Sequence, residues 1–209
     1  MKGLLATGFT AIGTGSAAML TLHAGSDLDP LHSVISEYAY QSAGWLLPAS
    51  LTLFAAGSAL IAEALRRSGT NRWVVVLLLV WGASMFLVGA FPTDRPGVPL
   101  SLSGGIHRYA AFVAFLVMPV AGMLLARANV RFARTVRALS GVALGALLLV
   151  VVPYVVRMFG IPLASEDIPA GLTQRAVVIT ELGVLALAGL SMLKPSARAS
   201  GPGVTPIMA

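Results

Sequence analysis

The stretch WVVVLLLVWGASMFLVGAF, residues 73–91, contains no charged side chain. A helix needs roughly 20 mainly apolar residues to cross the hydrocarbon core of a bilayer, so this stretch has the length and composition of one membrane span. Similar stretches recur along the chain, and the six candidate spans are residues 3–23, 44–65, 73–91, 107–126, 138–160 and 174–193. The sequence therefore predicts an all-α fold, a polytopic membrane protein built as a six-transmembrane-helix bundle.

The composition of the whole chain agrees with this fold. Of its 209 residues, 57% are hydrophobic and only 11% are charged, and the mean hydropathy is +0.87. Soluble domains carry about 25% charged residues, so an ordinary soluble domain is excluded, and the abundance of apolar residues excludes a disordered chain. The chain contains no cysteine, which excludes a disulfide, a thiolate nucleophile and a cysteine metal site.

Polar connections rich in Gly, Pro and Ser separate the spans, and we expect a single transmembrane domain over residues 1–193. Residues 194–209 are rich in Pro, Ser and Gly, and we expect them to form a short disordered tail. The first span could instead be a signal peptide cleaved near Ala24. Its apolar run of about 20 residues exceeds the roughly 7–15 residues of a typical signal peptide, so we expect it to be retained.

The net charge is +6, and the basic residues are unevenly distributed. If the N-terminus is cytoplasmic, four basic residues face outward (Arg95, Arg108, Arg157 and Arg175) and ten face inward: Lys2, Arg66, Arg67, Arg72, Arg127, Arg131, Arg134, Arg137, Lys194 and Arg198. The positive-inside rule favours this orientation in the cell membrane, with both termini cytoplasmic and outer loops at 24–43, 92–106 and 161–173. Basic residues so placed are typical of anchors that face anionic lipid, and we expect no nucleic-acid partner because no aromatic platform accompanies them.

Acidic residues follow the opposite distribution. Glu63 alone lies inside, Glu181 lies in the outer half of the sixth span, and the outer loops contain Asp27, Asp29, Glu37, Asp94, Glu166 and Asp167. Glu181 comes about seven residues into its predicted span, so roughly 10 Å below its start. An ionisable group at that depth is costly unless it faces the bundle interior or water, which makes Glu181 a candidate functional residue. The alternative is that Glu181 pairs with a neighbouring arginine and serves only to fix the packing of the helices.

Three further residues are candidates for binding a ligand. Gln174 precedes Glu181 by seven residues and so projects from the same helix face. Arg108 and Arg175 are predicted in the first turn of helices whose N-termini face outward, where the helix dipole favours anions. We therefore expect an anion near them, either a carboxylate such as Glu37 or Asp94 or a ligand phosphate or carboxylate. Simple snorkelling of both arginines to the interface is the alternative.

The three histidines, His23, His32 and His107, could form a zinc site together with Asp29 or Asp94. No pair of them has the spacing of two ligands on one helix, so such a site would depend entirely on tertiary structure. The sequence also contains no phosphate-binding loop, haem motif or dinucleotide fingerprint. We therefore predict no metal and no cofactor.

The outer-face candidates lie within four short motifs: Ser-Glu-Tyr at 36–38, Phe-Pro-Thr-Asp at 91–94, Gly-Gly-Ile-His-Arg at 104–108 and Gly-Leu-Thr-Gln-Arg at 171–175. As a set, these motifs resemble those of the domain-of-unknown-function 998 family, six-helix bacterial membrane proteins, over roughly residues 5–193. The resemblance implies six helices and a shared polar cluster at the outer face, and it supplies no reaction. More distantly, the first outer loop followed by Ser-Glu is similar to six-helix eukaryotic membrane proteins linked to lipid remodelling.

We expect an intramembrane enzyme that performs acid–base chemistry on a lipid or isoprenoid-like substrate: cyclisation, rearrangement or head-group hydrolysis. In this hypothesis Glu181 and Asp94 serve as general acid or base, and His107 shares the proton transfer. The polar head group of the substrate would bind Arg108, Arg175, Glu37 and Gln174, and membrane lipids are the expected partners.

Two alternatives remain open. A small proton-coupled transporter needs a polar path through both halves of the membrane. The only acidic residue in the inner half is Glu63, near its edge, which counts against this alternative. A non-catalytic scaffold or regulatory protein would use the outer polar cluster only for structure. The sequence does not distinguish such a scaffold or regulatory protein from an enzyme.

Overall fold

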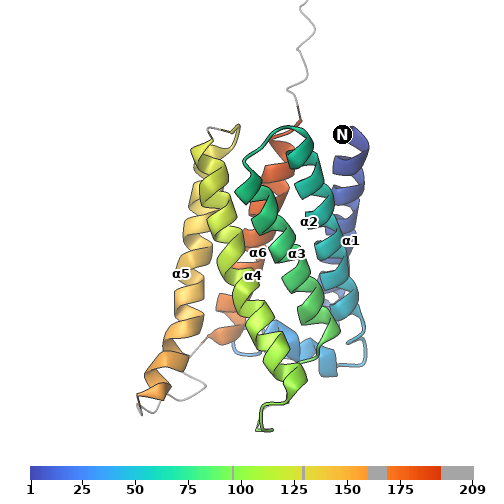
Figure 1. Ribbon diagram of the computed structural model, residues 1–209. Coiled ribbons are helices and arrows are strands. Elements are labelled where there is room, and N and C mark those ends of the chain that lie inside the picture. Colours follow the sequence, from blue (N-terminus) through green and yellow to red (C-terminus); the bar gives the residue numbers. More distant parts are fainter. Residues whose placement is uncertain (96, 129, 160–168, 194–209) are drawn as a thin grey trace, which may run out of the picture.

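The computed structural model describes residues 1–95, 97–128, 130–159 and 169–193. Its elements are α1 (Lys2–Ala24), the short 3₁₀ helix η1 (Ile35–Tyr40), α2 (Leu46–Arg67), α3 (Arg72–Ala90), α4 (Leu102–Arg127), α5 (Ala133–Met158) and α6 (Ala170–Leu190) (Figure 1). The six α-helices are each long and apolar enough to cross a membrane, α5 over Ala133–Val152. The described residues contain no strand. The prediction of an all-α chain with six apolar spans is confirmed.

Helices α4, α5 and α6 begin at least four residues earlier than the sequence predicted, and two of these differences concern candidate site residues. Helix α4 begins at Leu102 rather than at residue 107, because the side chain of Ser101 caps it by accepting a hydrogen bond from the backbone N–H of Gly104 at 3.0 Å. Helix α6 begins at Ala170 rather than at residue 174. The expectation that Arg108 and Arg175 lie in the first turn is therefore wrong, since both lie in the second turn. The first turns that the sequence analysis missed, Leu-Ser-Gly-Gly at 102–105 and Ala-Gly-Leu-Thr at 170–173, contain the glycine and hydroxyl residues that are also typical of loops.

Helices that are consecutive in the chain pack side by side and run antiparallel, and α6 closes the bundle against α4 and α2 (Figure 1). One end of the bundle carries the N-terminus, the α2–α3 turn, the α4–α5 turn and the last turn of α6. We call it the N-terminal end. The opposite end carries η1 and the α3–α4 loop, and we call it the η1 end (Figure 1). The tail at 194–209 lies outside the described residues.

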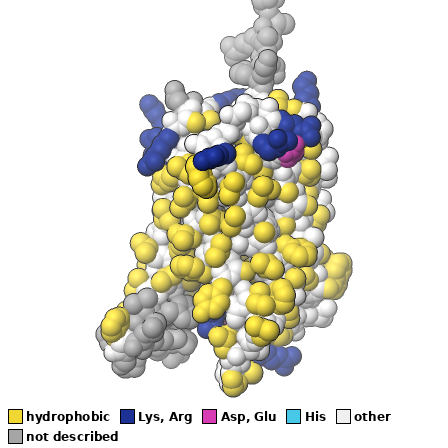
Figure 2. Space-filling model, in the orientation of Figure 1, with side chains coloured by type: hydrophobic (Ala, Val, Ile, Leu, Met, Phe, Trp, Pro, Cys, Tyr) yellow, Lys and Arg dark blue, Asp and Glu magenta, His cyan; other side chains and the backbone are white. Residues whose placement is uncertain are grey.

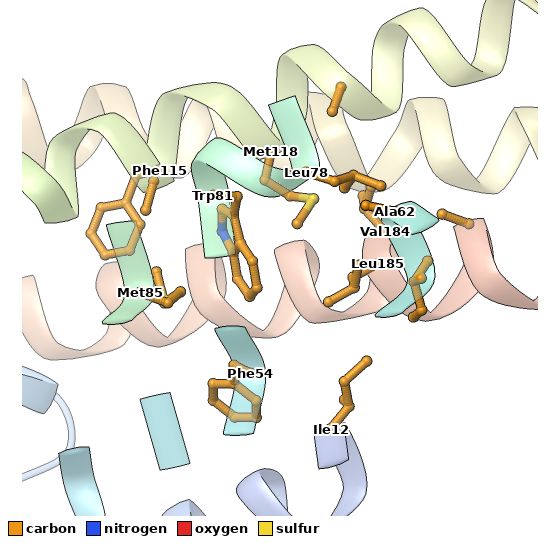
Figure 3. Close-up of a cluster of buried hydrophobic side chains, with 14 of the residues drawn as sticks. Ile12, Phe54, Ala62, Leu78, Trp81, Met85, Phe115, Met118, Val184 and Leu185 are labelled. Atoms are coloured by element: carbon orange, nitrogen blue, oxygen red, sulfur yellow. The ribbon is translucent and has the colours of Figure 1, made fainter. Parts of the chain in front are cut away.

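The centre of the bundle is mainly apolar and tightly packed. Trp81 and Met118 face Leu185 of α6, and Phe54 of α2 lies on the other side of that helix (Figure 3). Small residues allow close helix approach, which drives association where lipid replaces water. At Gly57, an added Cβ would lie 2.6 Å from the side chain of Ile12, so α1 and α2 depend on this glycine for their close packing.

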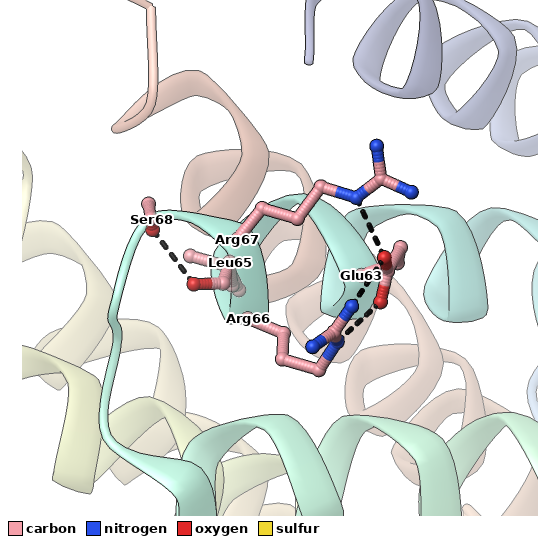
Figure 4. A network of polar contacts seen from close by, with 5 residues as sticks. All are labelled: Glu63, Leu65, Arg66, Arg67 and Ser68. Atoms are coloured by element: carbon pink, nitrogen blue, oxygen red, sulfur yellow. Dashed lines mark hydrogen bonds and ion pairs between the residues drawn. The ribbon is translucent and has the colours of Figure 1, made fainter.

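The surface shows the pattern of a membrane protein. Figure 2 shows an apolar belt, with Lys and Arg side chains gathered mainly at the N-terminal end. At this end Glu63 accepts hydrogen bonds from the Nε atoms of Arg66 and Arg67, each at 2.6 Å (Figure 4). These are pairs between residues three and four apart on one helix face, as the 3.6-residue period of a helix allows.

Candidate functional site

Glu181 lies near the middle of α6, at the centre of the bundle. Counted from Ala170 it is roughly 16 Å along the helix, deeper than the sequence predicted because α6 begins earlier. The residue is 0% exposed, and its Oε2 accepts a hydrogen bond from Trp81 Nε1 on α3 at 2.9 Å. Its Oε1 has no hydrogen-bond partner among the described residues, and no ion pair found there includes Glu181. A neighbouring arginine therefore does not account for this acid within the described part of the chain.

His107 is buried on α4. Two backbone carbonyls at the C-terminal end of α3 determine which of its ring nitrogens carries the proton. Its Nδ1 lies 3.0 Å from the carbonyl oxygen of Val88 and 2.9 Å from that of Phe91. Carbonyls at a helix C-terminus lack partners within the helix and can only accept, so we assign the ring proton to Nδ1. The neutral ring then has its lone pair on Nε2, the nitrogen that can act as a base.

A small cavity of about 40 Å³ lies beside His107, beneath η1. Its polar lining comes from Ser36, His107 and Gln174, and its apolar lining includes Met19, Leu47, Leu51, Met85, Phe115 and Val178. A single water needs about 10–15 Å³ of such volume, so the cavity has room for a few waters or a small polar group. Met85 is one turn from Trp81, and Val178 is one turn from Glu181. The Glu181–Trp81 pair therefore lies about one helical turn deeper than the cavity.

Gln174 fastens η1 over the cavity. Its Oε1 accepts a hydrogen bond from the backbone N–H of Ile35, the first residue of η1, at 2.6 Å. A second bond joins α6 to the loop that precedes η1, from the N–H of Leu172 to the carbonyl of Leu31 at 3.0 Å. The structure therefore places Gln174 at the cavity, where its side-chain oxygen is hydrogen-bonded to η1.

Arg175 holds the α1–η1 loop against α6. It is 9% exposed, and its Nη1 donates to the carbonyls of Pro30 at 2.9 Å and Ser33 at 2.7 Å. Its Nη2 donates to the hydroxyl of Tyr38 at 2.8 Å, and this hydroxyl is also hydrogen-bonded to Nδ1 of His23. The Tyr38 hydroxyl therefore links the guanidinium of Arg175 to the imidazole of His23.

The sequence analysis did not foresee this network: it considered His23 only as a zinc ligand and gave Tyr38 no role beyond the Ser-Glu-Tyr motif. Tyr38 is fully buried in η1, although it belongs to the Ser-Glu-Tyr motif that pointed to this region. A tyrosine in a polar loop motif was the available signal. The partners found for Arg175 are carbonyl and phenol oxygens, whereas the sequence led us to expect a carboxylate or a ligand anion.

Asp94 lies at the N-terminus of α4, outside the cavity. It accepts a hydrogen bond from the N–H of Ser101 at 2.9 Å, and its carboxylate lies so close to Gly104 that a Cβ there would collide with it. Hydrogen bonds from the side chain and backbone of Ser101 hold the pKa of Asp94 below its usual value. An anion at this position also complements the helix dipole.

The remaining candidates lie on the outside of the η1 end. Arg108 is exposed on the surface of α4, next to the inward-facing His107. Glu37 is half-buried and lies on the far side of η1 from the cavity, in a surface hollow with Arg95. The structure thus brings His107 and Gln174 to one cavity and keeps Asp94, Arg108 and Glu37 outside it. Glu166 and Asp167 lie outside the described residues.

The three histidines lie apart in different local settings. His23 is hydrogen-bonded to Tyr38, His32 pairs with Asp29 at 2.5 Å, and His107 is held by carbonyls. Within the described ranges, no group of three or more His, Cys, Asp or Glu side chains is arranged to hold a metal ion. The zinc site considered from the sequence therefore has no support in this part of the chain.

Six apolar helices with a buried polar cluster near one end define the chain as a multi-pass membrane protein. The family described as "Protein of unknown function (DUF998)" matches residues 9–191, and the chain belongs to this family. The resemblance inferred from the four motifs is thereby confirmed. No curated protein and no solved structure matched the chain.

Proposed function

We propose that this protein is an intramembrane enzyme that performs acid–base chemistry on a lipid or isoprenoid-like substrate in the cavity beneath η1. The observation that carries the proposal is the position of His107, which lines the cavity with its Nδ1 proton held by two carbonyls. A histidine with a fixed tautomer and its basic nitrogen available is the usual form of a general base.

His107 and Glu181 have complementary roles in this proposal. Nε2 of His107 removes a proton from a substrate hydroxyl or a water in the cavity, and the carbonyls of Val88 and Phe91 stabilise the resulting cation. Among the described residues, Glu181 has one hydrogen-bond donor, the neutral Trp81, and a charged carboxylate in such a site would be costly. We therefore assign it the role of a proton donor that reaches the cavity through a water one turn above it.

In this proposal, the polar residues around the cavity hold η1 in place over it. The cavity is too small for a lipid, so the substrate enters when η1 moves away from the helices. Gln174 and Arg175 make the bonds that must open and close, which supports a positioning role for both residues. Asp94 holds Ser101, the N-cap residue of α4, and so positions His107, which the same helix carries.

The test uses the purified protein with a total lipid extract of the expressing cells, and mass spectrometry of the lipids before and after incubation. We expect a product with the wild type and at least a hundredfold less with His107→Gln, since general acid–base catalysis contributes about 10²–10⁴-fold. His32→Gln is the matched control, because His32 is an exposed histidine of the same end. Equal product from wild type and His107→Gln would refute the proposal.

The proposed orientation places the protein in the cell membrane with both termini in the cytoplasm. It is supported by the basic side chains at the N-terminal end (Figure 2) and the positive-inside rule. Because the chain has no native cysteine, single cysteines report topology directly. A membrane-impermeant maleimide should label Asp27→Cys in intact cells and Ser68→Cys only after lysis, and the reverse pattern would invert the orientation.

Proton-coupled transport is the second candidate, and Glu181 is the observation that favours it. A buried acid near the middle of a membrane helix with one uncompensated oxygen is typical of proton-relay sites. The acid at the other end, Glu63, is bound by two arginines on the surface of α2 and does not continue a path below Glu181. Solute flux that depends on a pH gradient in proteoliposomes, and that Glu181→Gln abolishes, would favour transport over catalysis.

A further inference from the structure

A surface hollow of about 410 Å³ lies on the outer side of η1 and is lined by Leu28, Glu37, Tyr40, Gln41 and Arg95. The helix η1 separates this hollow from the buried cavity. Its first two residues line the cavity, and Glu37 and Tyr40 line the hollow. The hollow is therefore a second polar site, distinct from the one that contains His107.

The α3–α4 loop forms one wall of the hollow and is attached to η1 by Tyr40. The Tyr40 hydroxyl donates a hydrogen bond to the carbonyl of Thr93, and the guanidinium of Arg95 lies 4.9 Å from the centre of the Tyr40 ring. The ring face stabilises the guanidinium and limits its movement. Arg95 is thus positioned at the hollow by an aromatic ring.

Two opposite charges border the hollow without pairing with each other. Neither Glu37 nor Arg95 takes part in any ion pair found among the described residues. A guanidinium binds phosphate oxygens through several N–H groups at once, and a carboxylate accepts hydrogen bonds from an ammonium. A ligand that carries a phosphate and an ammonium close together satisfies both residues.

The surroundings of the hollow indicate that this ligand is the head group of a lipid. The α3–α4 loop continues from Arg95 into exposed apolar residues, among them Leu100, which is 55% exposed, and Leu102 at the start of α4 is 83% exposed. Tyr109, about two turns further along α4, is 71% exposed, and Trp45 at the start of α2 is also exposed. Exposed tyrosine and tryptophan mark the level of the head groups at a membrane surface.

We propose that the hollow binds the head group of a zwitterionic phospholipid of the phosphoethanolamine class, with the phosphate at Arg95 and the ammonium at Glu37. An ethanolamine ammonium has N–H donors for the carboxylate, whereas a choline group has none, so ethanolamine lipids should bind more tightly. Binding of such a lipid in the hollow does not depend on the proposed function. The identification of this lipid as the substrate rests on the proposed function.

Native mass spectrometry of the purified full chain tests the site. The probe is an equimolar mixture of phosphatidylethanolamine, phosphatidylcholine and phosphatidylglycerol with identical acyl chains. We expect the wild type to retain phosphatidylethanolamine preferentially and Glu37→Gln to lose that preference by about tenfold, the effect of removing one charge-assisted hydrogen bond. Arg95→Gln should weaken retention of all three lipids, because all carry the phosphate.

Matched controls separate the site from general charge effects. Asp27→Asn and Arg134→Gln each remove an exposed charge outside the hollow and should bind as the wild type does. Glu37→Asp keeps the carboxylate and should keep the lipid preference, and circular dichroism of Glu37→Gln and Arg95→Gln should show the helix content of the wild type. Equal retention of the three lipids by the wild type, or an unchanged preference in Glu37→Gln, would overturn the inference.

Two further arms identify the source of the ligand and its link to catalysis. Soluble phosphoethanolamine in excess should not displace the lipid, and efficient displacement would overturn a membrane lipid as the ligand. His107→Gln should bind lipid normally while losing turnover. If it keeps turnover while Glu37→Gln loses lipid, the proposed function fails and the binding site stands. If His107→Gln loses turnover and Glu37→Gln keeps its preference, the binding site fails and the catalytic proposal stands.

Discussion

The two ends of the bundle use their charged residues in different ways. At the N-terminal end, Glu63 pairs with Arg66 and Arg67 on the exposed face of one helix, three and four residues away (Figure 4). At the η1 end, Arg175 is buried and bonds to groups from the α1–η1 loop and η1, more than a hundred residues away. Exposed local pairs contribute little because water and salt screen them, whereas buried donors must be satisfied. We therefore expect a large effect from mutation of the buried Arg175 at the η1 end and a small effect from mutation of the exposed Glu63 at the N-terminal end.

The largest expected effect comes from Arg175→Ala. This change leaves the carbonyls of Pro30 and Ser33 and the Tyr38 hydroxyl without their shared donor, and we expect a loss of roughly 2–4 kcal/mol in unfolding free energy. The measurement is unfolding in detergent, followed by circular dichroism. Arg134→Ala is the control, because it removes an exposed arginine at the opposite end. Equal stability of the two variants would contradict the contrast between the ends.

A smaller effect is expected from Trp81→Phe. This change keeps an aromatic ring in the core but removes the Nε1–H that Glu181 accepts, which should cost about 1–2 kcal/mol. In the Glu181→Leu background the same change should cost much less, because the acceptor is absent. A double-mutant cycle of unfolding free energies measures this coupling. Additive effects would show that the Trp81–Glu181 bond does not stabilise the bundle.

Asp94 provides a prediction that depends on pH. Ser101 holds the pKa of Asp94 below its usual value, so ionised Asp94 stabilises the fold above the pKa of an unfolded aspartate, about 3.9, and this contribution is lost as the pH falls through the lower folded-state pKa. Gly104→Ala should displace the carboxylate and remove that acid-dependent contribution. The melting temperature should then fall less steeply below about pH 4 in Gly104→Ala than in the wild type. Parallel profiles for both proteins would refute this role of Asp94.

The smallest effect is expected from Glu63→Gln. The Glu63 carboxylate and its arginine partners are at the surface, and solvent screens their interaction. The melting temperature should change little, and less than it does with Glu181→Gln, where the carboxyl is fully buried. A drop as large as that of Arg175→Ala would mean that the two ends do not differ as proposed.

Hydropathy predicted the six spans, and four motifs predicted the family, because both depend on residues that are close in sequence. The helix starts were less accurate, since capping by Ser101 depends on one side chain in a polar stretch. Sequence reasoning also selected Glu181, His107, Gln174 and Arg175 as residues near one end. It did not foresee that Arg175 binds carbonyls and Tyr38, because those partners lie on a loop far away in the chain.

The sequence by itself determined that the chain has six helices that can cross a membrane. Lipid offers no hydrogen-bond partners to backbone N–H and C=O groups, so an apolar segment in a membrane forms a helix, which satisfies these groups internally. The arrangement of the polar residues was decided only by the tertiary structure. Packing placed His107 at a cavity, put Glu181 one turn below it and left Glu37 and Arg95 outside, on the opposite side of η1. Local composition does not encode which residues converge, because each contact joins helices or loops whose approach depends on the packing of the whole bundle.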